Sequence, residues 1–408
     1  MKRLWVPLVL LLLAACSQVT PGPSSTELGP LTFGTSAYDY GYKLAKHSAG
    51  VYVVGATEGT LHTTQQGGSD AFIRKYDTGG GVTWGRQLGT PQNDYANGVA
   101  SDSSNNAYVA GTTSGSLAGS RGASDFFLRK YSASGSVAWT RQFGTSGSET
   151  ASDVAVSGSN IYVAGSVFNF TTNDTNANLT KFNTSGTQLW TRTFGSSLTD
   201  VARDVATDSS GNAYVVGFTD GVLTGTRGDG RDMFVRKYNT SGGVVWTKQF
   251  NYSFDDSAEA VAVNGTSVFV VGYASSDAGS SSNADVRLIK LTTSGSLGFS
   301  RSYGSSLNQY GADVSVVNGA VFVSGYEINA NDFGGFVSKY NGSGVIQWRA
   351  EQDSSGTDFS AGVLARSASE VYITGETDGV LGSGNSGNRD AFLRRLNGST
   401  GSTVWTDQ

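Results

Sequence analysis

One stretch of this chain returns seven times, and it constrains the fold more than any other feature. Each copy has three anchors. The first is an aromatic residue followed by Val or Ile, any residue and Gly. The second is a basic residue followed by an aromatic residue or Leu, and the third is a further aromatic residue. Successive anchors lie between 49 residues (Lys290 to Lys339) and 57 residues (Trp348 to Trp405) apart. A period of this size is typical of solenoids, propellers and repeat arrays. The first anchor begins at Tyr52, Tyr108, Tyr162, Tyr214, Phe269, Phe322 and Tyr372.

Each copy predicts four strands, most clearly over residues 204–250. β-Branched and aromatic residues dominate the runs, and Gly, Asn, Asp and Ser separate them. Four strands repeated radially make a β-propeller. We therefore predict an all-β, seven-bladed β-propeller of four-stranded antiparallel blades. We expect small residues of the first strand to lie near the axis and the last aromatic to pack between blades, at Trp84, Trp139, Trp190, Trp246, Phe299, Trp348 and Trp405.

A ring must close, because an open ring exposes strand edges. Residues 31–34 (Leu-Thr-Phe-Gly) match the end of a fourth strand, and the chain stops just after Trp405 without that ending. We predict that residues 31–34 complete the last blade beside residues 404–408, with Phe33 near Trp405.

The first residues predict export. Lys2 and Arg3 precede an apolar run that ends at Ala15, which is too short to span a bilayer as a helix and fits a signal sequence. Leu-Ala-Ala-Cys at 13–16 resembles a bacterial lipobox, which implies cleavage before Cys16 and lipid attachment there. An ordinary signal peptide with an incidental cysteine is the alternative. We expect a signal peptide at 1–15, a flexible Pro- and Ser-rich tether at 16–30 and the propeller at 31–408. The same resemblance implies, from Ser17 after the cysteine, sorting to the outer membrane if the host has one.

Charge and cysteine content narrow the partners. The formal net charge is −5 and no basic cluster is present, which argues against nucleic acid. Cys16 is the only cysteine, so no internal disulfide is expected. We expect a monomer that meets the membrane through lipidated Cys16 and binds an envelope protein or a polysaccharide.

An acidic residue precedes the first strand in six of the seven copies, and Gln309 stands there in the sixth. One hypothesis is a rim site for a divalent cation or a basic partner, because hard cations take carboxylate oxygens. The alternative is that each carboxylate caps its own turn. No other cofactor is expected. The candidate residues are Asp39, Asp94, Glu149, Asp200, Asp256 and Asp358.

Other features are interpreted as structural or left open. Repeat three departs from the pattern, with Asn176 where other copies have Asp and an Asn-rich loop before it, and this marks either a specialised rim or drift. The recurring Arg/Lys pairs, such as Arg74-Lys75, could pair with the strand-opening Asp or another carboxylate. The expectation is that their stems pack along a strand with solvated heads. His47 and His62 are expected at the surface, and neither has a visible nucleophile or metal partner.

Asp70 to Tyr76, Asp94 to Ala100 and Asp208 to Gly217 resemble the SBBP repeat of bacterial envelope propellers. Ser-Gly-x-x-x-Trp at 185–190 and 241–246 more loosely resembles the repeats of pyrroloquinoline-quinone enzymes, where it has a structural role. The SBBP resemblance implies a propeller fold and no particular activity. The sequence favours a lipid-anchored, non-catalytic binding or scaffold module of the cell envelope. The alternatives are a polysaccharide hydrolase or lyase, a quinone-type dehydrogenase, or a passive surface-layer component.

Overall fold

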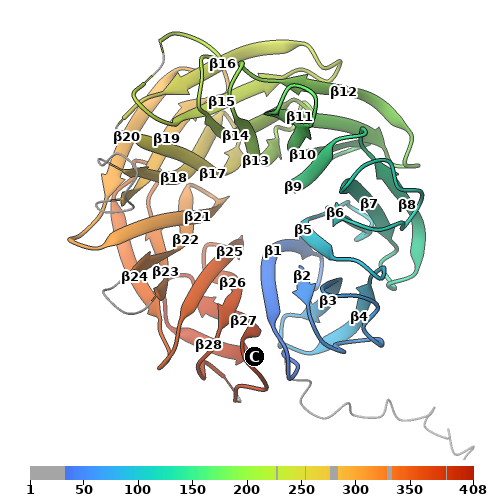
Figure 1. The fold of residues 1–408 in the computed structure, drawn as a ribbon. Helices are drawn as coiled ribbons and strands as arrows, with labels where there is room; N and C mark the ends of the chain where they lie inside the picture. Colours follow the sequence, from blue (N-terminus) through green and yellow to red (C-terminus); the bar gives the residue numbers. More distant parts are fainter. Residues whose placement is uncertain (1–32, 227, 253, 276–283, 329–332, 383) are drawn as a thin grey trace, which may run out of the picture. The chain divides into compact units, whose positions relative to one another are not determined.

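Seven four-stranded sheets, each built from four consecutive strands, stand around a common axis (Figure 1). This confirms the predicted seven-bladed propeller of antiparallel blades. The computed structural model describes residues 33–408 except 227, 253, 276–283, 329–332 and 383. The expected signal peptide, tether and Cys16 lie outside the described residues. Within the described part, no helix is long and apolar enough to cross a membrane.

Every blade runs from the axis outward in chain order. The innermost strands are β1 (Asp39–His47), β5 (Asp94–Ser101), β9 (Ser148–Ser157), β13 (Asp200–Thr207), β17 (Asp255–Asn264), β21 (Asn308–Val317) and β25 (Asp358–Ser367). The second strands are β2 (Gly50–Thr57), β6 (Ala107–Thr113), β10 (Asn160–Asn169), β14 (Ala213–Thr219), β18 (Ser267–Ser275), β22 (Ala320–Ile328) and β26 (Glu370–Thr377).

The third strands are β3 (Asp70–Asp77), β7 (Asp125–Tyr131), β11 (Asp174–Asn183), β15 (Asp232–Tyr238), β19 (Ala284–Thr292), β23 (Phe333–Tyr340) and β27 (Asp390–Asn397). The outermost strands are β4 (Val82–Leu88), β8 (Val137–Phe143), β12 (Gln188–Phe194), β16 (Val244–Phe250), β20 (Leu297–Tyr303), β24 (Ile346–Gln352) and β28 (Thr403–Asp407).

The position of a strand in its blade explains its sequence. Every residue of β2 and β6 is buried, because these strands have a blade packed on each face, and they read as continuous apolar runs. In β4 and β8 most residues are partly or fully exposed, because these strands form the outer edge. The buried side chains gather into clusters between neighbouring blades, such as Val54, Ile73 and Val99 with Val109. Burying a side chain of this size stabilises the fold by about 1.5–3 kcal/mol.

A shared backbone carbonyl joins each blade to the next. Trp84 Nε1 and Lys75 Nζ both donate to the carbonyl oxygen of Ala133, across 3.1 and 2.8 Å. Gly135 follows with φ of 82°, and its missing side chain leaves room for the Trp84 ring. The same arrangement recurs around the ring, although Phe299 has no N–H to donate, so Lys290 binds alone there. The accepting residues are Thr78, Ala133, Thr184, Thr240, Thr293, Gly342 and Gly398.

This geometry confirms that the recurring aromatic packs between blades. It corrects the expectation for the basic pairs, whose second members bind a carbonyl of the next blade. Lys181 is 5% exposed and Lys237 is 9% exposed, so both residues are largely buried.

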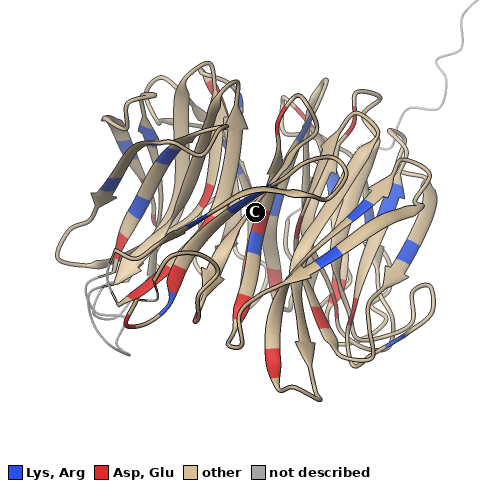
Figure 2. Cartoon of the chain, turned by 90° about the horizontal axis from the view of Figure 1, so that it is seen from above, with Lys and Arg blue, Asp and Glu red and all other residues tan. Residues whose placement is uncertain are grey.

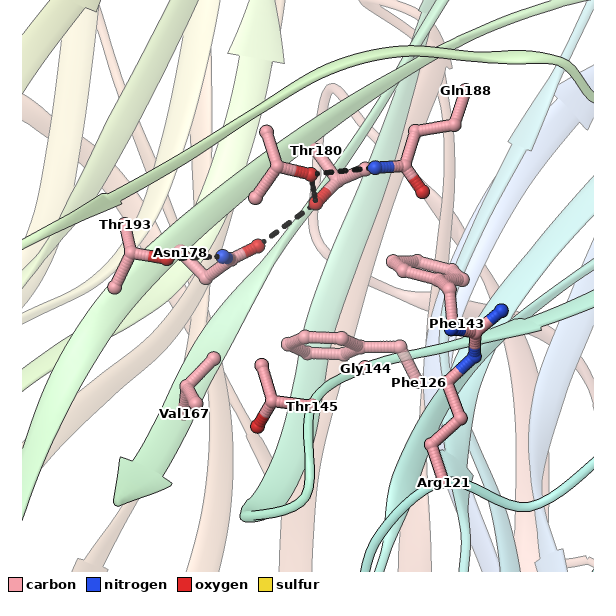
Figure 3. A pocket seen from close by; sticks show the side chains of 11 residues that line it. Arg121, Phe126, Phe143, Gly144, Thr145, Val167, Asn178, Thr180, Gln188 and Thr193 are labelled. Atoms are coloured by element: carbon pink, nitrogen blue, oxygen red, sulfur yellow. Dashed lines mark hydrogen bonds between the residues drawn. The ribbon is translucent and has the colours of Figure 1, made fainter. Parts of the chain in front are cut away.

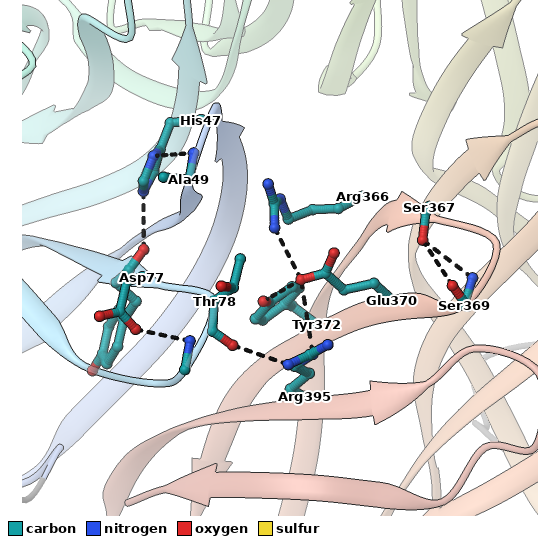
Figure 4. A network of polar contacts seen from close by, with 12 residues as sticks. His47, Ala49, Asp77, Thr78, Arg366, Ser367, Ser369, Glu370, Tyr372 and Arg395 are labelled. Carbon is teal, nitrogen blue, oxygen red and sulfur yellow. Dashed lines mark hydrogen bonds and ion pairs between the residues drawn. The ribbon is translucent and has the colours of Figure 1, made fainter.

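The first and last blades join through side-chain contacts and through a backbone bridge, in which the Asp39 N–H donates to Arg389 O across 2.8 Å. The described residues show no strand exchanged between these two blades. Arg395 Nη1 donates to Thr78 O across 3.0 Å, within the polar network of Figure 4. Phe33 is fully buried in a cluster against which Trp405 packs, as predicted. Gly34 lies against Asp390 as Gly89 lies against Asp70 in the first blade. Phe33 and Gly34 thus continue the sequence pattern of β28 at the end of the last blade.

Candidate functional site

A β-bulge interrupts the innermost strand of every blade at the same place. In β1 the register shifts between Gly41 and Lys43, so Tyr42 is left without a partner residue on β2. A bulge bends the strand and re-aims a side chain, and bulges are frequent beside functional sites. The seven unpaired residues are Tyr42, Asn97, Ser152, Arg203, Glu259, Ala312 and Ala361.

These seven residues are chemically diverse although the repeat around them is uniform. They comprise a phenol, an amide, a hydroxyl, a cation, an anion and two methyl groups, whereas the residue before each is always Gly, Ala or Ser. Several of them reach the neighbouring blade: Asn97 Nδ2 donates to Ala151 O across 2.6 Å, and Ser152 Oγ donates to Ala202 O across 2.7 Å. The bulge therefore gives each blade its own group on a common scaffold at the inner wall.

In four of the seven blades the residue after the bulge is charged, and these four residues form a cluster that spans the axis. Lys43 Nζ lies 2.8 Å from Asp313 Oδ1 and 3.9 Å from Asp204 Oδ1, and Asp204 belongs to a blade on the opposite side of the ring. The outer oxygens of the two carboxylates accept the backbone N–H groups of Val363 and Val261. We call Lys43, Asp153, Asp204 and Asp313 the axial cluster.

The protonation states in the axial cluster follow from burial and charge. Burial by itself would lower the pKa of Lys43, but Asp204 and Asp313 raise it above its ordinary value, so the ammonium stays charged. Burial, followed by the charge of Asp204 and a hydrogen bond to it, raises the pKa of Asp153 well above its usual range. Asp153 therefore holds a proton that it donates to Asp204. Burial also raises the pKa of Asp313, against the opposing charge of Lys43.

Next to the axial cluster, toward the start of the innermost strands, a pocket of about 250 Å³ opens among aromatic side chains. Ala312, the bulged residue of β21, presents only a methyl group to this space. We call this space the mouth pocket. Its lining residues are Arg203, Glu259, Tyr273, Tyr310, Gly311, Ala312 and Tyr326.

The aromatic rings of the mouth pocket form a continuous arc. The ring centres of Tyr273 and Tyr310 are 4.9 Å apart, those of Tyr310 and Tyr326 are 5.1 Å apart, and Phe359 lies 5.0 Å beyond Tyr326. A second stack of Tyr38, Tyr40 and Tyr42 stands on the first blade. Burial raises the pKa of Tyr273 and of Tyr326, so both phenols stay neutral and present hydroxyl groups beside apolar faces.

Partly exposed ion pairs flank the arc. Arg203 Nε lies 3.5 Å from Glu259 Oε2, and the two side chains are 43% and 23% exposed. Arg389 Nη1 lies 2.8 Å from Glu376 Oε1. Acidic and basic residues are interspersed along the strands in the side view (Figure 2). Aromatic faces with neutral hydroxyls and opposed charges suit the binding of a polar ligand. Among the described residues, no group of three His, Cys, Asp or Glu side chains comes together as metal ligands.

The six acidic residues predicted as a rim site each accept hydrogen bonds from the turn before the innermost strand. Asp39 Oδ2 accepts the backbone N–H and the hydroxyl of Thr35, across 2.6 and 2.9 Å. Asp94, Glu149, Asp200, Asp256 and Asp358 make the equivalent bond to the residue four positions earlier. All six are fully buried, and burial raises the pKa of Asp39 against the opposing hydrogen bonds from Thr57 and Thr35. These carboxylates therefore cap the turn before the innermost strand. Binding of a cation or a partner at these residues stays a prediction.

Sequence reasoning did not find the mouth pocket, because a bulge leaves no motif. The available signal was the residue after the small one in each innermost strand, which differs from copy to copy.

His47 is buried, which corrects the expected surface position, and its Nε2 lies 2.9 Å from Tyr76 O. His62 accepts a hydrogen bond from Arg74 Nε, and burial followed by the charges of Arg74 and Arg86 lowers its pKa to about 3.

The comparison with a family model decides the repeat type. The model described as the SBBP β-propeller repeat matches residues 83–118 and 189–223. This chain carries SBBP repeats. Both matches start in an outermost strand and run into the next blade, so the SBBP unit crosses the blade boundary, where the Trp and Lys contacts lie.

Other proteins resemble the SBBP propeller in sequence or in fold. It is 28% identical over 218 residues to "Regulatory protein FlaEY" of Caulobacter vibrioides, an alignment that covers 48% of this chain and 22% of that protein. The chain therefore spans about a fifth of that relative's length. Sqt1 from Chaetomium thermophilum superposes with a TM-score of 0.52 and 11% identity, over 93% of this chain and 90% of that one. Acylaminoacyl peptidase of Pyrococcus horikoshii superposes with a TM-score of 0.51 and 9% identity, over 92% of this chain and 53% of that one. These structures share the fold alone.

Proposed function

We propose that this SBBP propeller is a non-catalytic binding module that takes its ligand at the mouth pocket. The observation that carries the proposal is that three bulged residues of different chemistry, Arg203, Glu259 and Ala312, line one aromatic pocket. Rigid scaffolds commonly present recognition groups in this way, since fixed backbone geometry limits the entropy lost on binding.

The composition of the pocket supports binding to a polar partner. Tyr273, Tyr310 and Tyr326 offer flat apolar faces with hydroxyl groups. Arg203 offers hydrogen-bond donors, and Glu259 offers hydrogen-bond acceptors. Tyrosine and arginine are the residues enriched at the centres of protein interfaces. An envelope protein or a polysaccharide provides a suitable surface for these groups.

The location belongs to the same proposal. The apolar run that ends at Ala15 and the lipobox-like sequence before Cys16 support export and lipid anchoring in a bacterial envelope, at the outer membrane where the host has one. Several acyl chains on one cysteine provide stable anchoring, whereas a single chain does not. The Pro- and Ser-rich residues 16–30 would give the propeller reach from the membrane.

The test is photo-crosslinking of the full-length protein in living cells. A photoreactive phenylalanine replaces Tyr326 in the mouth pocket, and in a control it replaces Leu189, which is 50% exposed on β12. We expect one abundant envelope component to be captured from position 326 and lost when Ala312→Trp fills the pocket. Equal capture from both positions would contradict binding at the mouth pocket. Membrane fractionation of Cys16→Ala tests the anchor separately, because loss of the anchor releases the protein without changing the pocket.

A further inference from the structure

Blade three lacks three large side chains that most other blades carry on one face. Asn178 stands where five blades have Phe, Thr180 where four have Arg, and Thr193 where four have Gln. β11 and β12 pair Asn178 with Thr193 and Thr180 with Thr191, so all of these positions share a face. The corresponding larger residues are Phe72, Phe127, Phe234, Phe336 and Phe392, then Arg74, Arg129, Arg236 and Arg394, then Gln87, Gln142, Gln249 and Gln408.

In the other blades these side chains fill the space toward the preceding blade. Arg236 lies with its guanidinium carbon 4.2 Å from the ring centre of Phe194, and its Nε donates to Thr247 Oγ1 across 2.8 Å. Gln249 Nε2 donates to Gly221 O and to Asp232 Oδ2. In blade three, Phe143 and Thr191 occupy the places of Phe194 and Thr247, whereas the arginine and the glutamine are absent.

The truncations leave a cavity of about 230 Å³ between blades two and three (Figure 3). One wall is apolar and consists of Phe126, Phe143 and Val167. The opposite wall is a row of hydrogen-bonded polar groups, in which Gln188 donates to Thr191, Thr191 pairs with Thr180, Thr180 donates to Asn178, and Asn178 donates to Thr193. A second cavity of about 320 Å³ shares Thr145, Val167 and Thr193 with the first. We call the first cavity the blade-three pocket.

The charge of the blade-three pocket is one-sided. Arg121 is its only charged lining residue, and no aspartate or glutamate lines it. The Arg121 backbone N–H donates to Asp125 Oδ2 across 2.8 Å, which fixes the residue at the edge of the pocket with an exposed side chain. A guanidinium binds carboxylates through a planar pair of donors.

We propose that the blade-three pocket binds a saccharide unit that carries a carboxylate. The C–H face of a pyranose ring packs on the face of Phe143, and its hydroxyl groups exchange hydrogen bonds with Asn178, Thr193 and Gln188. Arg121 pairs with the carboxylate. A small volume, an aromatic wall and a few convergent polar groups are the features of ligand sites for small molecules. This site is independent of the mouth pocket and goes beyond the function proposed for it.

The test uses the full-length, detergent-solubilised protein on a glycan array that carries uronate- and sialate-bearing glycans beside their neutral counterparts. One variant restores the residues of the other blades, with Asn178→Phe, Thr180→Arg and Thr193→Gln together. The restored residues are those that neighbouring blades accommodate, so we expect this variant to fold with an unchanged or higher melting temperature and to lose glycan binding. Arg121→Gln should weaken binding to acidic glycans about tenfold or more, since charge-assisted pairs are roughly twice as strong as neutral ones. Lys248→Gln removes the same charge from an exposed position of β16 as a control.

Three outcomes would overturn the proposal. The first is that the wild-type protein binds no glycan on the array. The second is that the restored variant binds as the wild-type protein does, or that Ala312→Trp in the mouth pocket abolishes binding instead. The third is that neutral and acidic glycans bind equally and Arg121→Gln has no effect. That result would mean that the pocket does not recognise a carboxylate on the saccharide.

Discussion

Trp405 donates its indole N–H to the backbone carbonyl of Thr78 across 3.4 Å, and this bond ties the last blade to the first. The equivalent bond inside the ring, from Trp84 to Ala133, is 3.1 Å long and joins two blades that are adjacent in the chain. The Trp405 bond differs because it joins blades that are distant in the chain, so only non-covalent contacts hold this junction together.

Trp405→Ala should therefore destabilise the protein more than Trp246→Ala does. Each change loses a partly buried indole and one hydrogen bond, which we expect to cost about 2–4 kcal/mol. The closing junction also loses its tie between blades that are distant in the chain. Chemical denaturation followed by tryptophan fluorescence and circular dichroism measures both variants. Equal losses of stability would show that the closing junction has no special role. Trp405→Phe, which reproduces the natural Phe299 junction, should cost about 1 kcal/mol.

Lys43 balances buried carboxylates from two other blades, and Lys43→Met should be strongly destabilising. Without the ammonium, Asp204 and Asp313 face each other across the axis without compensation, and leaving buried charges unpaired costs about 3–5 kcal/mol. Urea titration gives the free energy of unfolding. The double variant Lys43→Met with Asp313→Asn should recover part of the loss, and no recovery would contradict the charge argument.

The pH dependence of stability should reveal the proton on Asp153. Burial and the charge of Asp204 raise the pKa of this carboxyl in the folded chain, so between its unfolded and folded pKa values the folded chain binds more protons. The stability that this group contributes is fully present below the unfolded pKa and is lost as pH rises through the folded pKa. Asp153→Asn retains a donor to Asp204 without titrating.

The difference in unfolding free energy between wild type and Asp153→Asn should therefore change with pH. We expect wild type to gain stability relative to the variant as pH falls from neutral toward mild acid. Thermal unfolding over that range measures the difference, and a constant difference would mean that Asp153 is ionised at neutral pH.

Removing the Arg203–Glu259 pair should separate binding from stability. Both side chains are partly exposed, and exposed ion pairs contribute about 0–1 kcal/mol. The double variant Arg203→Ala and Glu259→Ala should therefore unfold within about 1 kcal/mol of wild type and lose capture of the mouth-pocket ligand. Arg301→Ala, an exposed arginine on β20, is the matched control. Unchanged capture in the double variant would exclude this ion pair from recognition.

The repeat determined the fold without help from tertiary information. Seven copies of an aromatic-Val-x-Gly strand, a basic-aromatic strand and a Trp strand allow few arrangements other than a seven-bladed ring, because each copy must bury two faces against its neighbours. The same periodicity identified the interblade role of Trp84 and its counterparts. It also assigned Asp39 and its counterparts to the turn before each innermost strand, with capping as one of two interpretations.

Tertiary structure alone decided where the pockets lie. The mouth pocket depends on a bulge that shifts one residue per blade, and the axial cluster depends on Lys43 meeting Asp204 and Asp313 across the ring. The blade-three pocket arises where Asn178, Thr180 and Thr193 are small at the same time. Strand alternation already places Asn178 and Thr180 on one face, but only the pairing of β11 with β12 brings Thr193 beside them. Local sequence specifies strands and turns through propensity and alternation, whereas a cavity or a charge pair depends on which distant side chains meet once the ring has closed.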